Sequence, residues 1–246
     1  MPRVELGDVD LFYTSEGEGP PVLLVHGWAC DSHDWSHQFE AFAARHRVIA
    51  ADNRGHGRSS VPPAGYEPRV FAADLARLLG HLDSGPVVAV GHSLGAVIVS
   101  VMAVEYPDLV RAVVAVDPAY ALSESIRDRI LANVEAFRGD DGHELAARAQ
   151  REMDAPTTPR HLVTWHGRRV LGTSHDVVSA TYAGLYEPDD QVGLDPESSE
   201  YLRRRRCPVL AFYAMPKRAA HERTLSEHPS SHVVDWEGAG HWLHQE

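Results

Sequence analysis

The sequence is poor in cysteine, in positive charge and in long apolar runs. Its 246 residues include only 2 cysteines, Cys30 and Cys207, which are too few for a disulfide framework and lack the spacing of a metal knuckle. The longest apolar stretch, residues 97–104, is interrupted by Ser100 and is far shorter than a membrane span. Residues 1–5 lack the apolar core of a signal peptide. These features predict a cytoplasmic protein with reduced thiols.

Positive charge is scarce because 23 lysines and arginines face 35 aspartates and glutamates, a formal net charge of −12. An acidic surface repels nucleic-acid phosphates and anionic lipids, so we expect neither as a partner. The rest of the composition, with 43% apolar and 24% charged residues, is that of an ordinary globular domain. Residues 203–206 are all arginine and are interpreted as a solvated helix end.

Short apolar runs alternate with segments of helical spacing over the first half of the chain. The runs are residues 9–13, 22–25, 87–90 and 110–116, and the helical segments include residues 33–44 and 70–82. Residues 9–13 alternate between apolar and polar, as in a half-buried strand, whereas residues 22–25 and 87–90 are continuously apolar, which is typical of parallel strands buried on both faces. The pattern predicts an α/β fold in which helices flank a mostly parallel sheet and the active site lies at the carboxyl ends of the strands.

The pattern changes over residues 119–201, where helical segments follow one another without a buried strand. The strand pattern resumes at residues 207–213 and again at 232–234. We therefore predict a core formed by residues 1–118 and 202–246, with residues 119–201 inserted as a helical cap over the strand ends.

The strongest chemical signal is Gly91-His92-Ser93-Leu94-Gly95, which lies between an apolar strand and an apolar helix. A Gly-x-Ser-x-Gly motif in this context forms a tight turn that presents the serine hydroxyl at the sheet edge. The alternative is an ordinary solvated turn serine. We predict that Ser93 is a nucleophile.

A serine nucleophile needs a base and donors for the oxyanion. His241 lies in a glycine-flanked loop after the last strand and is the candidate base, although a surface histidine is the alternative in a chain with 16 of them. The loop after residues 22–25 can direct the backbone N–H of Trp28, together with that of Leu94, at an acyl oxygen.

Four motifs, in this order along the chain, resemble the α/β-hydrolase superfamily. They are His26-Gly27, Asp52-x-Arg54-Gly55-His56-Gly57-x-Ser59, Gly91-x-Ser93-x-Gly95 and Gly240-His241. The resemblance implies an eight-stranded sheet, a cap and a Ser-His-acid triad that works without a cofactor. It also implies that residues 52–59 are structural.

The third member of the triad departs from the usual pattern of the superfamily. Most members of the superfamily carry the acid after the strand that matches residues 208–212, but residues 213–218 contain no carboxylate. Asp117, 24 residues after Ser93, is our first candidate, a placement that resembles zearalenone lactonases and some haloalkane dehalogenases. Because Asp-Pro is also a common turn, Glu222 and Glu227 remain alternatives.

The serine also favours one reaction class. Haloalkane dehalogenases and epoxide hydrolases of this fold attack carbon with a carboxylate, whereas a serine would leave an inert ether there. We therefore predict hydrolysis of a carboxylic ester or lactone through an acyl-serine, with a lactonase of the zearalenone type as the sharpest version. An amidase, thioesterase or C–C bond hydrolase would use the same residues. A ligand-sensing module with little turnover and a cofactor-free perhydrolase are the alternatives.

Aromatic residues near the expected cap predict an apolar or aromatic substrate. The candidates for substrate contact are Trp165, Tyr120, Tyr182 and Tyr186, and the alternative for each is packing of the cap onto the core. Trp165 comes first because zearalenone lactonases similarly carry a cap tryptophan that faces the substrate.

We predict no metal site. His33 and His37 have i, i+4 spacing, but they lack the glutamate of an HExxH motif and a third ligand. Members of the superfamily usually continue past the histidine loop with a helix, whereas this sequence ends at Glu246, so that helix is expected to be missing. The sequence leaves the oligomeric state open, a homodimer included.

Overall fold

The apolar runs of the sequence form one sheet of eight strands in the order β1-β2-β4-β3-β5-β6-β7-β8. The structure is a computed structural model and describes residues 2–246. The strands are β1 (Arg3–Glu5), β2 (Asp10–Glu16), β3 (Pro21–Val25), β4 (Arg47–Ala51), β5 (Val87–His92), β6 (Val110–Val116), β7 (Val209–Tyr213) and β8 (His232–Asp235). β1 and β2 pair antiparallel, and β3 to β8 are parallel. The predicted α/β fold with a mostly parallel sheet is confirmed.

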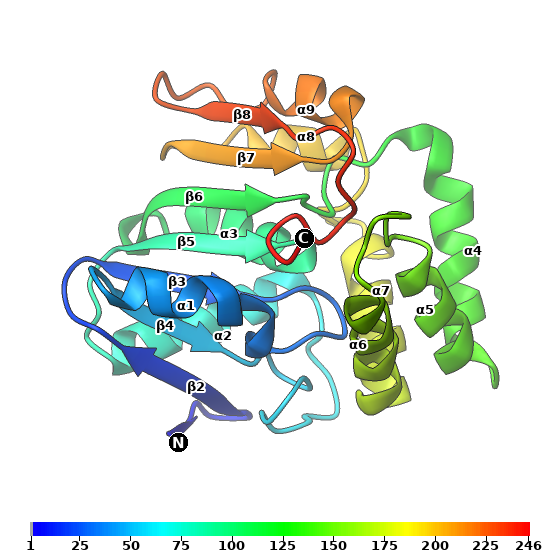
Figure 1. The fold of residues 1–246 in the computed structure, drawn as a ribbon, viewed down its shortest axis with the longest axis horizontal. Coiled ribbons are helices and arrows are strands. Elements are labelled where there is room, and N and C mark those ends of the chain that lie inside the picture. Colours follow the sequence, from blue (N-terminus) through cyan, green and yellow to red (C-terminus); the bar gives the residue numbers. More distant parts are fainter. Residues whose placement is uncertain (1) are drawn as a thin grey trace.

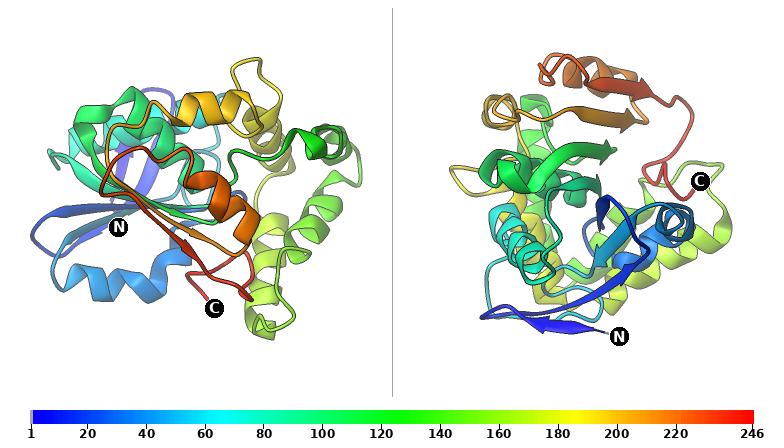
Figure 2. Two further views of the ribbon diagram at one scale, coloured as in Figure 1. Left: turned by 90° about the horizontal axis from the view of Figure 1, so that it is seen from above. Right: turned by 90° about the vertical axis from the view of Figure 1, so that its left-hand side faces the viewer.

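Helices cover both faces of this sheet. α1 (Ser36–Ala43) lies on one face, and α2 (Pro68–His81) and α3 (Leu94–Glu105) lie on the other (Figure 2). α3 is apolar all round and ten of its twelve residues are buried, as expected for a helix at the centre of a domain. α9 (Pro216–Glu222) and the short helices η1 (Ser32–Trp35), η2 (Pro107–Leu109) and η3 (Glu124–Ile126) lie in the connections.

Five α-helices, preceded by η3, separate β6 from β7 in the sequence. They are α4 (Arg127–Arg138), α5 (Gly142–Arg151), α6 (Arg160–Gly172), α7 (His175–Tyr186) and α8 (Glu197–Leu202). Figure 1 shows α4 to α7 beyond the carboxyl ends of the parallel strands, where the C-terminal residues also lie. We refer to residues 119–201 as the cap. No helix within residues 2–246 combines the length and the apolar character that crossing a membrane requires.

The arginine run after α8 differs from its prediction. Arg205 is buried, and its guanidinium pairs with Glu222 at 2.7 Å and donates to the Tyr120 hydroxyl at 3.1 Å. The interpretation of residues 203–206 as a solvated helix end is therefore wrong for Arg205. A buried glutamate more than a dozen residues further along the chain compensates its charge, a partnership that local composition does not reveal.

Candidate active site

Ser93 occupies a strained turn between β5 and α3. Its backbone has φ 53° and ψ −116°, a conformation that non-glycine residues rarely adopt. The flanking glycines make this turn possible, because a Cβ atom at Gly91 would overlap the backbone of Gly95, and one at Gly95 would overlap the Val25 carbonyl oxygen. The Ser93 N–H donates to the Val116 carbonyl at 3.0 Å, which ties the turn to the end of β6.

Asp117 directly follows β6 and meets His241 across the sheet edge. The Nδ1–H of His241 donates to Asp117 Oδ2 at 2.5 Å, and the Ala214 N–H donates to Asp117 Oδ1 at 3.4 Å. Burial opposes ionisation of Asp117, but the His241 hydrogen bond, the charges of His241 and Arg218 and the Ala214 N–H together lower its pKa below the usual value. The carboxylate therefore stays ionised and holds His241 with Nδ1 protonated.

Arg218 is a residue of this site that the sequence reasoning missed. It lies in the segment after β7 that lacks a carboxylate, and its guanidinium is 3.9 Å from Asp117 Oδ1. It also donates to the backbone carbonyls of Pro118 and Tyr120. The sequence did contain a signal for this role. Arg218 is a cation in the segment where the superfamily usually places the acid, and it complements an acid that follows β6 instead.

The two alternative acids lie elsewhere. Glu222 is buried and accepts hydrogen bonds from Arg205 at 2.7 Å and from the Tyr213 hydroxyl at 2.9 Å. Glu227 is exposed. Of the three carboxyl groups considered from the sequence, the one hydrogen-bonded to His241 is that of Asp117.

Ser93, Asp117 and His241 line one cavity of about 1340 Å³ between the strand ends and the cap. Trp28 and Leu94 line it as well. The loop before Trp28 passes close to the serine, since a Cβ atom on Gly27 would lie 3.3 Å from Ser93 Cβ. The hydrogen bonds found among residues 2–246 do not include one between Ser93 Oγ and His241, a contact that often tightens only when substrate binds.

Aromatic rings form the cap side of the cavity. Trp28 lies 5.6 Å from Phe137 and 5.2 Å from Tyr182, measured between ring centroids, and Tyr182 lies 5.0 Å from Tyr186. The Trp28 indole N–H donates to the Val178 carbonyl on α7 at 2.9 Å, which fixes the core loop against the cap. The structure thus brings Tyr182 and Tyr186 to the cavity together with Trp28.

The other two predicted aromatic contacts differ. Tyr120 borders the cavity, but its side chain is fully buried and its hydroxyl bonds Arg205. Trp165 is 40% exposed and lies beneath the Arg169 guanidinium, and it is not among the described residues that line the cavity. The structure therefore does not place Trp165 at this cavity, where it was predicted to contact the substrate. α6 turns Leu162, His166 and Val170 inward, and Trp165 falls one residue outside that buried stripe.

One group of side chains has the composition of a metal site. Ligand atoms of Asp34, His92 and His244 lie within 4.8 Å of one another. However, Arg169 forms an ion pair with Asp34, whose side chain is fully buried. A divalent cation placed there would face a fixed positive charge, so we propose no metal at this group. His33 and His37 are not part of it.

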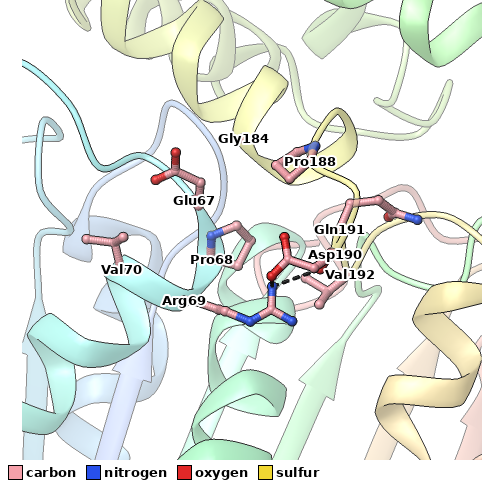
Figure 3. A pocket seen from close by; sticks show the side chains of 9 residues that line it. All are labelled: Glu67, Pro68, Arg69, Val70, Gly184, Pro188, Asp190, Gln191 and Val192. Carbon is pink, nitrogen blue, oxygen red and sulfur yellow. Dashed lines mark hydrogen bonds and ion pairs between the residues drawn. The ribbon is translucent and has the colours of Figure 1, made fainter.

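A second, smaller cavity of about 220 Å³ lies between the start of α2 and the loop after α7 (Figure 3). Its charged groups include Arg69 and Asp190, which pair with each other at 2.9 Å. Among residues 2–246, those that line it include no serine, cysteine or histidine. Ser93 and His241 line the larger cavity instead.

Comparison with known proteins agrees with this geometry. The sequence profile of the alpha/beta hydrolase fold family matches residues 20–159, more than half of the chain. The chain belongs to the α/β-hydrolase family. Similarity to a solved structure extends over the whole chain. A thermophilic esterase from Thermogutta terrifontis superposes with a TM-score of 0.85 and is 25% identical, and the match covers 100% of this chain and 93% of the esterase.

Curated α/β-hydrolase relatives include enzymes with different reactions. The 2-(acetamidomethylene)succinate hydrolase of Mesorhizobium japonicum is 39% identical over 54% of this chain and 48% of its own length. A non-heme haloperoxidase of Rhodococcus erythropolis is 43% identical over 39% of this chain and 35% of its own length. The chain thus spans about half the length of the first relative and about a third of the second, and the two are a hydrolase and a haloperoxidase.

Proposed function

We propose that this α/β hydrolase is a serine hydrolase that cleaves a carboxylic ester or lactone without a cofactor. One observation carries the proposal: the His241 imidazole donates to the buried Asp117 carboxylate at 2.5 Å beside a cavity that Ser93 also lines. An acid, a base and a nucleophile on one cavity wall are the parts that acyl transfer requires.

In the first half of the reaction, Ser93 Oγ attacks the substrate carbonyl carbon while His241 Nε2 takes the hydroxyl proton. Asp117 stabilises the imidazolium through the Nδ1–H hydrogen bond. The backbone N–H groups of Trp28 and Leu94 stabilise the oxyanion, a contribution of about 3 kcal/mol per donor. Leu94 suits this role because it begins α3, whose positive dipole end faces the developing charge.

In the second half, the tetrahedral intermediate expels the alcohol, which receives the proton from His241, and an acyl-serine remains. Water then attacks this ester while His241 accepts one of its protons. The second tetrahedral intermediate collapses to the carboxylic acid, and His241 returns the proton to Ser93 Oγ. If the substrate is a lactone, the alcohol and the acid leave as one molecule.

The cavity favours a bulky apolar or aromatic substrate. Its volume of about 1340 Å³ exceeds the usual range of small-molecule sites, about 300–1,000 Å³. Trp28, Phe137, Tyr182 and Tyr186 line the same cavity as Ser93 and form a cluster of contacting rings. A macrocyclic lactone of the zearalenone type is the sharpest form of the proposal, and a general carboxylesterase is the broader form.

Perhydrolysis is the second candidate, and the similarity to a haloperoxidase supports it. The same acyl-serine would be attacked by hydrogen peroxide in place of water and would release a peracid. This route needs no residue beyond Ser93, His241 and Asp117. Its signature is halide oxidation that depends on both peroxide and a carboxylic acid.

The test is turnover of a substrate panel by the wild type and Ser93→Ala. The panel contains p-nitrophenyl acetate and butyrate, a macrocyclic resorcylic lactone and an anilide, and a peroxide-dependent halogenation assay is run in parallel. We expect the wild type to cleave an ester or the lactone and the variant to lose that activity. Binding of the lactone by both proteins without turnover by either would instead indicate a ligand-sensing module.

A further inference from the structure

Three parts of the candidate site meet at the ring of His92. Its backbone is bonded to Ser93, its Nε2 lies 2.9 Å from the carbonyl oxygen of His241, and its Nδ1 lies 3.2 Å from where a Cβ atom on Gly27 would be. The His92 and His241 ring centroids are 4.6 Å apart. The His92 side chain is fully buried, and the rings of His244 and Trp242 also lie against it, with centroids 4.5 and 6.0 Å away.

The His241 contact fixes the protonation of the His92 ring. A carbonyl oxygen can only accept, so Nε2 carries the hydrogen and donates it to the His241 carbonyl. Burial, followed by repulsion from His244 and His241, lowers the pKa of His92 well below the usual value. The ring is therefore neutral, with its hydrogen on Nε2 and none on Nδ1.

Few bonds hold the backbone of the base. His241 belongs to the irregular segment 238–246, which lacks the ladder of a helix or strand. Its N–H donates to the Met153 carbonyl of the cap at 3.2 Å, and its C=O accepts from His92. One of these bonds comes from the cap and the other comes from the residue that precedes the nucleophile.

We infer that His92 is a positioning residue. Its Nε2–H holds the His241 backbone in the position from which the imidazole can reach Ser93 Oγ. The inference rests on the proposed serine hydrolase function. It explains why a buried histidine occupies the variable position of the Gly-x-Ser-x-Gly turn. Loss of the bond would leave a buried carbonyl unpaired and free the loop, and a shift of about 1 Å at a catalytic group costs about 10²-fold in rate.

Three substitutions at His92 separate the hydrogen bond from the bulk of the ring. His92→Gln carries an amide N–H at about the reach of Nε2, His92→Asn carries one that is too short, and His92→Leu carries none. We expect kcat on the best panel ester to fall about 10²-fold in the Asn and Leu variants, with KM changed less than about 3-fold, and to stay within about 5-fold of wild type in the Gln variant.

His143→Leu is the matched control. His143 Nε2 also bonds a backbone carbonyl, that of Val170 at 2.6 Å, but it joins α5 to α6 and does not line the cavity. We expect His143→Leu to change the melting temperature without a selective loss of kcat. If His92→Leu does not fold, the comparison of Gln with Asn decides, because both variants bury an amide.

A second readout does not depend on the substrate. The His241 Nδ1–H proton bonded to Asp117 should give a downfield NMR resonance, sharp in wild type, His92→Gln and His143→Leu, and broadened or lost in His92→Asn. An unchanged resonance and kcat in His92→Asn, or equal losses in Gln and Asn, would overturn the inference. If no panel substrate is turned over, the proposed function fails while the resonance still tests the role of His92.

Discussion

Asp117→Asn is the substitution that most sharply separates the acid on β6 from its alternatives. The asparagine has nearly the shape of the aspartate, so the cavity and the loop around it should be preserved. However, its NH₂ group can face His241 and then requires a lone pair on Nδ1, which moves the imidazole hydrogen to Nε2. In that tautomer the ring cannot take the proton of Ser93.

The expected loss in kcat is about 10⁴-fold, as for the acid of serine triads in general, which corresponds to about 5.4 kcal/mol of transition-state stabilisation. The structure supports a loss of this size because the Asp117 side chain is 8% exposed and its hydrogen bond to His241 is 2.5 Å long. The assay is steady-state hydrolysis of the best panel ester, with the far-ultraviolet spectrum and the melting temperature as checks on folding.

Glu222→Gln is the matched comparison. Glu222 neutralises Arg205 between side chains that are at most 1% exposed, so removing its charge should cost about 3–5 kcal/mol of stability. In a chain of this size that lowers the melting temperature by about 10 °C. Turnover below the melting transition should stay within a few-fold of wild type. A large loss of kcat in Glu222→Gln, with Asp117→Asn nearly unaffected, would refute the assignment of the acid.

Two further predictions concern stability. Burial lowers the pKa of His56 and His244 to about 3, whereas a histidine in the unfolded chain has a pKa of about 6.5. Protons therefore bind the unfolded state more tightly than the folded state. Stability that is complete above pH 6.5 is lost as the pH falls toward 3. At pH 5 each of the two histidines should lower the free energy of unfolding by about 2 kcal/mol. Urea unfolding at pH 7 and pH 5 measures this loss, and equal stability at the two pH values would contradict the prediction. Gly80→Ala should raise the free energy of unfolding by about 0.8–1 kcal/mol, because Gly80 is an exposed residue of α2 with open space at its Cβ position. Gly95→Ala should instead prevent normal folding, because its Cβ would overlap the Val25 carbonyl. Thermal melts of the two variants test this pair, and similar behaviour of both would be inconsistent with the turn geometry.

The sheet was readable from the sequence where a strand is buried on both faces. The runs at residues 22–25, 87–90 and 110–116 became β3, β5 and β6 within a few residues. β4 was not predicted, although Val48 to Ala51 are buried, because no glycine or proline marks a turn directly before it, as Gly-Pro does before the runs at residues 22–25 and 87–90. β1 has only three residues and depends on its pairing with β2.

The site shows a similar division. Ser93 and Asp117 could be proposed because each directly follows a recognisable strand, and parallel strands end at one edge. Trp165 could not be placed, because its orientation depends on the rotation of α6 about its own axis. Arg205 and Arg218 were missed for a related reason, since each pairs with a carboxylate distant in the sequence, Glu222 or Asp117, and both pairs form only once α9 has packed against the rest of the core.

The most direct test of the account is whether an acyl group is found on Ser93. The protein is mixed with p-nitrophenyl butyrate or the panel substrate it cleaves best, quenched in acid within the first turnovers, digested and analysed by mass spectrometry. We predict a stoichiometric acyl group on the peptide that contains Ser93, trapped in greater amount in Asp117→Asn if deacylation slows more than acylation, and absent in Ser93→Ala. Turnover that persists in Ser93→Ala, or an acyl group on a different residue, would contradict the central claim.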